Sequence, residues 1–122
     1  MPEKITPGPS LDGRTFTGVA NTADGEVGSA TRFHYRESAG VIRAEYSGGS
    51  IEQGYLVGTR DADVLDFRYV HLATDGSTSS GHCTSTVEVL DDGRLRLHET
   101  WTWESRPGSG TSVVEETAVP ET

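Results

Sequence analysis

Turn signals recur at nearly even intervals along this chain, and they limit the folds that it can adopt. Asp-Gly and Gly-Gly pairs supply the positive φ that tight hairpins need. The signals are ADGE, SAG, SGGS, RDAD, TDGS, DDG and RPGSG, at residues 23–26, 38–40, 47–50, 60–63, 74–77, 91–93 and 106–110. They separate eight strand-like runs, at about 13–21, 28–37, 41–47, 51–60, 64–74, 78–90, 94–105 and 111–118. All five prolines lie outside these runs, as expected for hydrogen-bonded strands.

Eight consecutive strands with short connections favour an antiparallel meander. An open meander would leave two exposed edges, whereas pairing of the last strand with the first removes both. We therefore predict an all-β fold, an eight-stranded antiparallel up-and-down β-barrel, which has room for side chains or one small ligand. A two-sheet sandwich is the alternative, but it usually needs a long crossing loop. The barrel would span residues 11–118, between flexible tails at 1–10 and 119–122.

Composition agrees with a small β protein and argues against some partners. Only 33% of the residues are hydrophobic, so the core of this single domain must be modest. The net charge of -9 repels phosphate backbones and anionic lipids, and we expect neither nucleic-acid nor membrane binding. The single cysteine cannot form an internal disulfide, and the N-terminal residues lack an apolar signal segment. Both features favour a cytoplasmic location.

Alternation within the runs predicts which side chains face the interior. In the run 94–105 one face carries Leu95, Leu97, Glu99, Trp101 and Trp103. The run 78–90 is ambiguous, because either its Cys83 face or its His82 face could point inward. The other side chains predicted to face inward are Phe33, Tyr35, Ile42, Ala44, Tyr46, Ile51, Gln53, Tyr55, Val57, Leu65, Phe67, Tyr69 and His71. Such an interior is aromatic and partly polar, whereas a barrel that served stability alone would be filled with aliphatic side chains.

Glu99 is the most informative of these positions, because burial of an unpaired carboxylate costs several kcal/mol. It must be paired, protonated or close to a water-filled cavity. Burial beside Trp101 would raise its pKa, which suits a general acid or base. Across the lumen, His71 and Tyr69 share one face of the run 64–74 and could contact it. The alternatives are a Glu99 bridge to Arg or Tyr that fixes the strand register, and a His71 side chain that is merely a hydrogen-bonded core residue.

The predicted site combines these polar groups with the rings around them. The candidate catalytic residues are Glu99, His71 and Tyr69. The candidate ligand-binding residues are Trp101, Tyr46, Tyr35, Tyr55, Phe67, Phe33, Cys83 and Arg68. Arg68 would reach the lumen only if the alternation of its run were shifted by one residue. Trp101 could instead plug one end of the barrel, and Cys83 could be a small hydrophobic residue rather than a nucleophile.

We expect neither a metal nor another cofactor, because no C-x-x-C or H-E-x-x-H spacing occurs. A haem would need a proximal histidine in a roomy apolar cavity, for which His71 is the candidate.

Several longer segments carry a further pattern: NTADGEVGSATRFHY, EYSGGSIEQGYLVG, FRYVHL, GHCTSTVEVL and DGRLRLHETWTWES. Together they resemble a small bacterial family, from about Leu11 to Glu116, whose members are often labelled N-acetylglutamate synthase. The chain lacks the glycine-rich turn and helix with which acetyltransferases of that class hold a pyrophosphate. Its architecture resembles the calycin group, which includes lipocalins, fatty-acid-binding proteins and streptavidin-like barrels, and this implies a calycin- or lipocalin-like barrel. Its first run has no Gly-x-Trp, so no lipocalin ligand residues are transferred.

Two functions follow from this lumen. The first is a small-molecule-binding intracellular barrel, in which rings stack on the ligand and Glu99 and His71 orient it. The alternative is an enzyme that uses the same lumen for proton transfer, as an isomerase, dehydratase or cyclase acting on a small hydrophobic substrate, with Glu99 as general acid or base. A third possibility is a barrel that acts through its outer face, for example as a homodimer.

Overall fold

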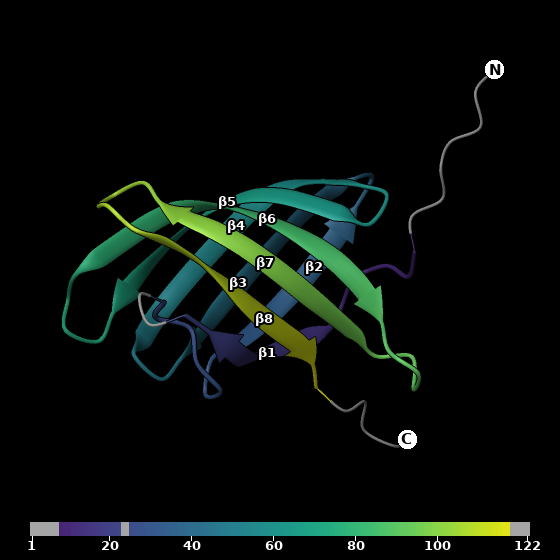
Figure 1. Ribbon diagram of the computed structural model, residues 1–122, viewed down its shortest axis with the longest axis horizontal. Helices are drawn as coiled ribbons and strands as arrows, with labels where there is room; N and C mark the ends of the chain where they lie inside the picture. Colours follow the sequence, from purple (N-terminus) through teal and green to yellow (C-terminus); the bar gives the residue numbers. More distant parts are fainter. Residues whose placement is uncertain (1–7, 23–24, 118–122) are drawn as a thin grey trace.

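The strands close into a barrel. The computed structural model describes residues 8–22 and 25–117. Its strands are β1 (Thr15–Asn21), β2 (Arg32–Ser38), β3 (Val41–Gly48), β4 (Ile51–Asp61), β5 (Val64–Ala73), β6 (Thr78–Val89), β7 (Leu95–Trp103) and β8 (Ser109–Glu116). Each strand pairs antiparallel with the next along the chain, and β1 also pairs with β8 (Figure 1). The predicted all-β, eight-stranded up-and-down barrel is therefore confirmed.

Two of the turns that the sequence marked have the expected backbone conformation, and residues 23–24 of the predicted turn ADGE lie outside the described residues. Gly76 and Gly93, which follow aspartate, both have a φ of 90°, a conformation that favours glycine. The second strand differs from the prediction, because it begins at Arg32 and not at residue 28. Residues 28–31 form a turn, in which the Thr31 amide donates to the Gly28 carbonyl at 3.0 Å.

One end of the barrel is sealed by an ion pair and by the segment before β1. The Arg60 guanidinium, whose side chain is only 1% exposed, donates to Glu37 Oε1 at 2.9 Å and to the Pro9 carbonyl at 3.0 Å. The amide of Leu11, a fully buried residue, donates to the same Glu37 oxygen. We call this end the closed end. Residues 1–7 of the predicted N-terminal tail, residue 118 of the predicted barrel and the predicted tail at 119–122 lie outside the described residues.

Aliphatic and aromatic side chains occupy different parts of the interior. Aliphatic side chains gather toward the closed end, where the fully buried residues include Leu11, Ile42, Leu65, Leu95, Leu97 and Val114. Rings gather toward the opposite end, which we call the mouth; they include Phe33, Tyr46, Tyr69, His71, Trp101 and Trp103. The mouth is formed by the β1–β2, β3–β4, β5–β6 and β7–β8 connections.

The predicted alternation fails in β4. Tyr55 and Val57 were expected to face inward, but they are 53% and 59% exposed, while Gly54 and Leu56 are buried. The pairing of β4 with β5 shifts register between Ile51 and Gln53. An irregularity of this kind reverses the facing of every later residue in the strand.

The ambiguous run 78–90 has its Cys83 face toward the core. Cys83 and Ser85 are buried in β6, and His82 lies on the outer face, where it pairs with Asp66. In the described part of the chain, no helix is long and apolar enough to cross a membrane.

Candidate functional site

A cavity lies among the rings near the mouth. Its volume is about 40 Å³, which is enough for a few water molecules. The lining residues are Asn21, Gly25, Val27, Phe33, Tyr46, Leu56, Phe67, Tyr69, His71, Cys83, Glu99, Trp101, Trp103 and Ser112. Gly25 and Val27 belong to the β1–β2 connection, so this loop covers one side of the cavity.

The structure brings most of the sequence-predicted site residues to this cavity. Those that line it are Glu99, His71, Tyr69, Trp101, Tyr46, Phe67, Phe33 and Cys83. Tyr35 is buried elsewhere, edge-on to Phe16 with ring centres 5.2 Å apart. Two further residues of the predicted site do not reach the cavity. Tyr55 faces outward because of the register shift in β4, and Arg68 lies on the outer face with 66% of its side chain exposed, where it contacts Glu104.

Glu99 is held by two serines from the neighbouring strands. Ser112 Oγ in β8 donates to Oε1 at 2.8 Å, and Ser85 Oγ in β6 lies 3.5 Å from Oε2. The residue is 8% exposed. Burial raises the pKa of Glu99 to about 7, although the two serine hydrogen bonds oppose this rise. Within the described residues Glu99 has no arginine, tyrosine or histidine as a hydrogen-bond partner, so its carboxyl can be neutral or charged near pH 7.

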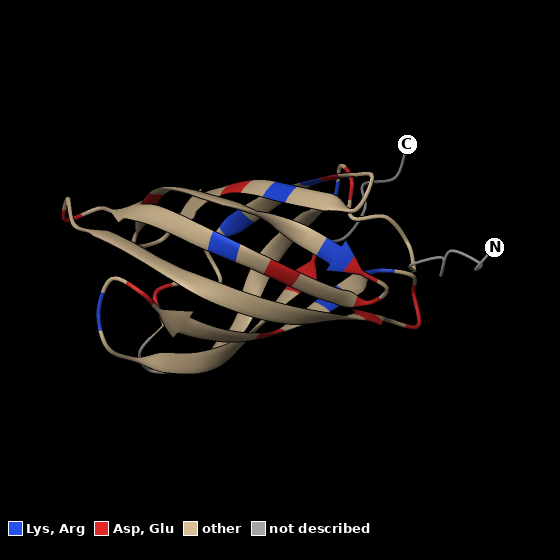
Figure 2. Ribbon diagram, turned by 90° about the horizontal axis from the view of Figure 1, so that it is seen from above, with Lys and Arg blue, Asp and Glu red and all other residues tan. Residues whose placement is uncertain are grey.

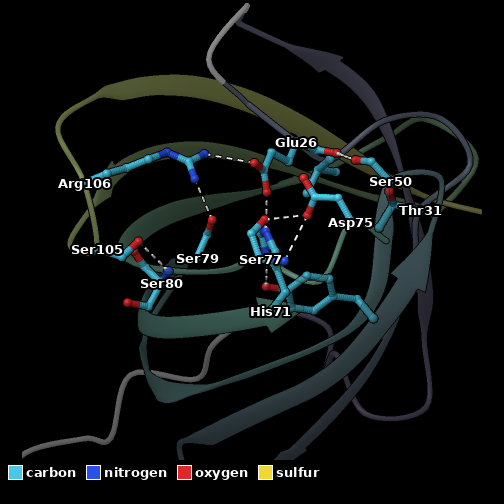
Figure 3. Close-up of polar contacts among 12 residues, drawn as sticks. Glu26, Thr31, Ser50, His71, Asp75, Ser77, Ser79, Ser80, Ser105 and Arg106 are labelled. Carbon is cyan, nitrogen blue, oxygen red and sulfur yellow. Dashed lines mark hydrogen bonds and ion pairs between the residues drawn. The ribbon is translucent and has the colours of Figure 1, made fainter. Parts of the chain in front are cut away.

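A chain of polar contacts crosses the mouth (Figure 3). Tyr46 Oη lies 3.0 Å from His71 Nδ1, and His71 Nε2 lies 2.7 Å from Glu26 Oε1. Arg106 then donates to Glu26 Oε2 at 2.9 Å and to Ser79 Oγ at 2.7 Å. The chain, which we call the mouth latch, joins the β1–β2 loop to β5, β6 and the β7–β8 turn. It therefore fixes the loop that covers the cavity.

The charges of the mouth latch favour the arrangement in which the β1–β2 loop covers the cavity. Partial burial alone would raise the pKa of Glu26, but hydrogen bonds from His71 and Arg106 outweigh it, and the pKa is lowered. The Arg106 guanidinium carbon also lies 4.1 Å from the ring centre of Trp103, a favourable cation–π geometry. Sequence reasoning missed both Glu26 and Arg106. The available signal was that opposite charges occur in the first and last turns of a meander, which lie at the same end of a closed barrel.

Two polar atoms at the cavity lack partners. Asn21 Oδ1 and Trp103 Nε1 are buried and have no hydrogen-bond partner among the residues that the structure describes. The other polar atom of the Asn21 amide, Nδ2, donates to the Val27 carbonyl at 3.0 Å, which fixes the direction of the amide. An unpaired buried donor or acceptor costs about 1–3 kcal/mol. Both residues line the cavity, so its walls contain one unpaired acceptor and one unpaired donor.

The remaining reactive groups give little support to other chemistry. Burial raises the pKa of the Cys83 thiol well above its ordinary value, and the nearby Glu99 raises it further, so the residue is a weak nucleophile at neutral pH. Over residues 8–22 and 25–117, no three His, Cys, Asp or Glu side chains converge as metal ligands would.

Comparison with known proteins agrees with this architecture. A family model described as avidin-like protein matches residues 9–117, which includes every strand and the whole cavity lining. This match fits the calycin-like fold that the sequence predicted. No curated protein and no solved structure gives a match.

Proposed function

The chain belongs to the avidin-like protein family, and on this premise we propose that it binds one small molecule in the aromatic half of its barrel. The observation that carries the proposal is the pair of unpartnered atoms, Asn21 Oδ1 and Trp103 Nε1, at the cavity. An interior that served folding alone would pair these atoms or replace them with apolar groups. A bound ligand would supply both missing partners.

The lining indicates the chemistry of that ligand. It needs a donor for Asn21 Oδ1, an acceptor for Trp103 Nε1, and either a donor or an acceptor toward Glu99. The rings around these groups favour a flat, largely apolar frame. Because the cavity is small while the β1–β2 loop covers it, a ligand of more than a few atoms would have to displace this loop.

Native mass spectrometry of protein purified from its own host tests the proposal. We expect a retained small molecule. Its affinity should fall about tenfold in Asn21→Ala and in Trp103→Phe, since each change removes one hydrogen bond to a buried group. Thr102→Ala is the matched control, because Thr102 is the exposed neighbour of Trp103 in β7. The absence of any retained or titratable compound, or equal affinity in all three variants, would contradict the proposal.

The enzymatic alternative has one observation in its favour, the Glu99 carboxyl with a pKa of about 7 at the cavity. Such a group can donate or accept a proton at neutral pH. Burial raises the pKa of Tyr69 well above its ordinary value, so its hydroxyl would stay a hydrogen-bond donor to a substrate oxygen.

Incubation of the retained compound with the protein separates binding from turnover. A mass-neutral rearrangement or the loss of water, abolished in Glu99→Gln while affinity persists, would favour the enzyme. Unchanged compound would favour the binding protein.

A further inference from the structure

The outer face of β2 and β3 carries arginines that, unlike the other arginines, have no ion-pair partner among the described residues. Arg32, Arg36 and Arg43 point outward and have no carboxylate partner among the described residues. The remaining arginines all pair with a carboxylate; they are Arg14, Arg60, Arg68, Arg94, Arg96 and Arg106. Acidic residues are plentiful, with 19 Asp and Glu against 10 Lys and Arg, so a shortage of partners does not explain the difference.

Two of these arginines oppose each other. Arg36 in β2 and Arg43 in β3 are direct cross-strand partners, and like charges in this position destabilise a sheet. Arg32 at least donates to Thr17 Oγ1 and to the Ser29 carbonyl. The guanidinium groups of Arg36 and Arg43 make no such contact with any described residue. An anion placed between them would remove the repulsion.

A groove runs beside this pair on the outside of the barrel. Its volume is about 400 Å³, and its lining residues are His34, Arg36, Arg43, Ala44, Glu45, Tyr55, Leu56 and Val57. Tyr55 and Val57, the residues that the register shift in β4 turns outward, form its apolar wall. Val70, an exposed residue of β5, lies directly opposite Tyr55 and extends this wall. Paired cations thus lie next to exposed apolar side chains, and the lining holds a single carboxylate, that of Glu45.

We propose that this surface, the arginine groove, docks a short acidic segment of a partner protein. Carboxylates of the segment would pair with Arg36 and Arg43, and aliphatic side chains between them would pack on Tyr55 and Val57. Arginine and tyrosine are the residue types enriched at the energetic centres of protein interfaces. The proposal does not depend on the ligand of the lumen, because the groove lies on the opposite side of the sheet.

The charges argue against two other occupants. Long polyanions such as nucleic acids, and anionic membranes, would be repelled by a chain with a net charge of -9. Figure 2 shows acidic positions on several strands and turns, so this repulsion is not confined to one end of the barrel. A second copy docked by a two-fold axis through the Arg36–Arg43 pair would place the same face against itself, and this pair would then meet a like pair. A short acidic segment avoids both conflicts.

A titration of the full chain with an end-capped peptide of alternating Glu and Leu tests the proposal. Binding is measured from the amide chemical shifts of the protein. We expect shifts centred on Arg36, Arg43, Tyr55 and Val57, and an affinity that falls as salt rises. The double variant Arg36→Gln/Arg43→Gln should bind about tenfold more weakly, since each exposed ion pair contributes modestly. Arg94→Gln/Arg96→Gln makes the same change of charge at the start of β7 and in the turn before it, across the barrel, and should leave affinity within about twofold.

Several results would overturn the proposal. A matching Gln–Leu peptide that binds equally well would show that charge plays no part, and shifts confined to the mouth would place the peptide elsewhere. Stronger binding of a DNA duplex or of phosphatidylserine vesicles to the same residues would indicate a general anion surface. A dimer that Arg36→Gln/Arg43→Gln dissociates, seen by analytical ultracentrifugation, would assign the face to a second copy. Melting curves for each variant exclude unfolding as the cause of lost binding.

Discussion

Glu99 shows how a single buried carboxyl makes stability depend on pH. Its pKa is about 7 in the folded protein and 4.5 in a solvated reference, so the folded state holds the proton more tightly. The stabilisation of the folded state by this bound proton is complete below about pH 4.5 and is lost as pH rises through 7. The difference between the two pKa values corresponds to about 3 kcal/mol.

Urea unfolding of the wild type and of Glu99→Gln measures this pH-dependent contribution of Glu99 to the free energy of unfolding. We expect the free energy of unfolding of the wild type, relative to the variant, to fall by about 3 kcal/mol between about pH 4.5 and pH 8. Glutamine mimics the protonated acid and does not titrate, so the subtraction isolates Glu99. A difference that stays constant over this range would show that the carboxyl is not destabilised by burial.

Glu26 governs access to the cavity through the mouth latch. Glu26→Gln removes the charge that faces Arg106 and His71, and charged hydrogen bonds of this kind contribute about 1.5–3 kcal/mol. We expect acrylamide to quench tryptophan fluorescence more strongly and a bound ligand to dissociate about tenfold faster. Glu88→Gln is the control, since Glu88 pairs with Arg96 and His98 on the outer surface. Equal quenching in both variants would count against a closing role for the mouth latch.

At the scale of single residues, the sequence predicted the site residues whose direction follows from alternation along a strand. It did not predict those whose position depends on pairing between distant parts of the chain. Glu99 and Trp101 could be predicted because they alternate with exposed residues in one regular strand. Glu26 and Arg106 are 80 residues apart in the chain and lie in connections, where no periodicity marks the direction of a side chain. Their pairing depends on barrel closure and on loop geometry, which local patterns do not encode.

Among the strands, β4 is where local pattern and structure disagree. Tyr55 and Val57 have the high β propensity and apolar character that predict a buried face, yet the register shift after Ile51 turns them outward. The inward positions are instead Gly54, Leu56 and Gly58, and two of these carry no side chain that could have signalled burial. A glycine that makes room for a ring leaves little hydrophobic signal in the sequence.

Gly54 tests this account of β4. A Cβ built at Gly54 would overlap the ring of Tyr46, which stacks on Phe33 at 4.7 Å between ring centres and contacts His71. Gly54→Ala should therefore lower the free energy of unfolding by about 1–3 kcal/mol, as overpacked core substitutions do. Gly28→Ala is the control, because a Cβ there meets nothing within 4 Å. Chemical denaturation of the two variants decides the point, and equal stabilities would mean that the Tyr46 ring moves without cost.

On the scale of the whole barrel, closure depends on its least-paired strand. β1 pairs with β2 through Thr15, Phe16 and Thr17, two backbone hydrogen bonds join Tyr35 to the residues just before β1, and the ladder of β1 with β8 shifts register between Gly18 and Ala20. The β4–β5 ladder, by contrast, runs from Ile51 to Asp61. Local opening is easiest where few backbone hydrogen bonds must break. The barrel should therefore open first at β1, the strand that precedes the loop covering the cavity.

Native-state hydrogen exchange can link this opening to ligand binding. Amides of β1 should exchange at least tenfold faster than those of β5 in the free protein. A ligand in the cavity would contact Asn21 and Val27 on one side and residues of β5 to β7 on the other, so binding must slow opening at β1 by mass action. An acidic peptide in the arginine groove lies on the outer face and should leave exchange in the β1–β2 loop unchanged. Equally slow exchange in β1 and β5 before any ligand is added would show that β1 is not where the barrel opens.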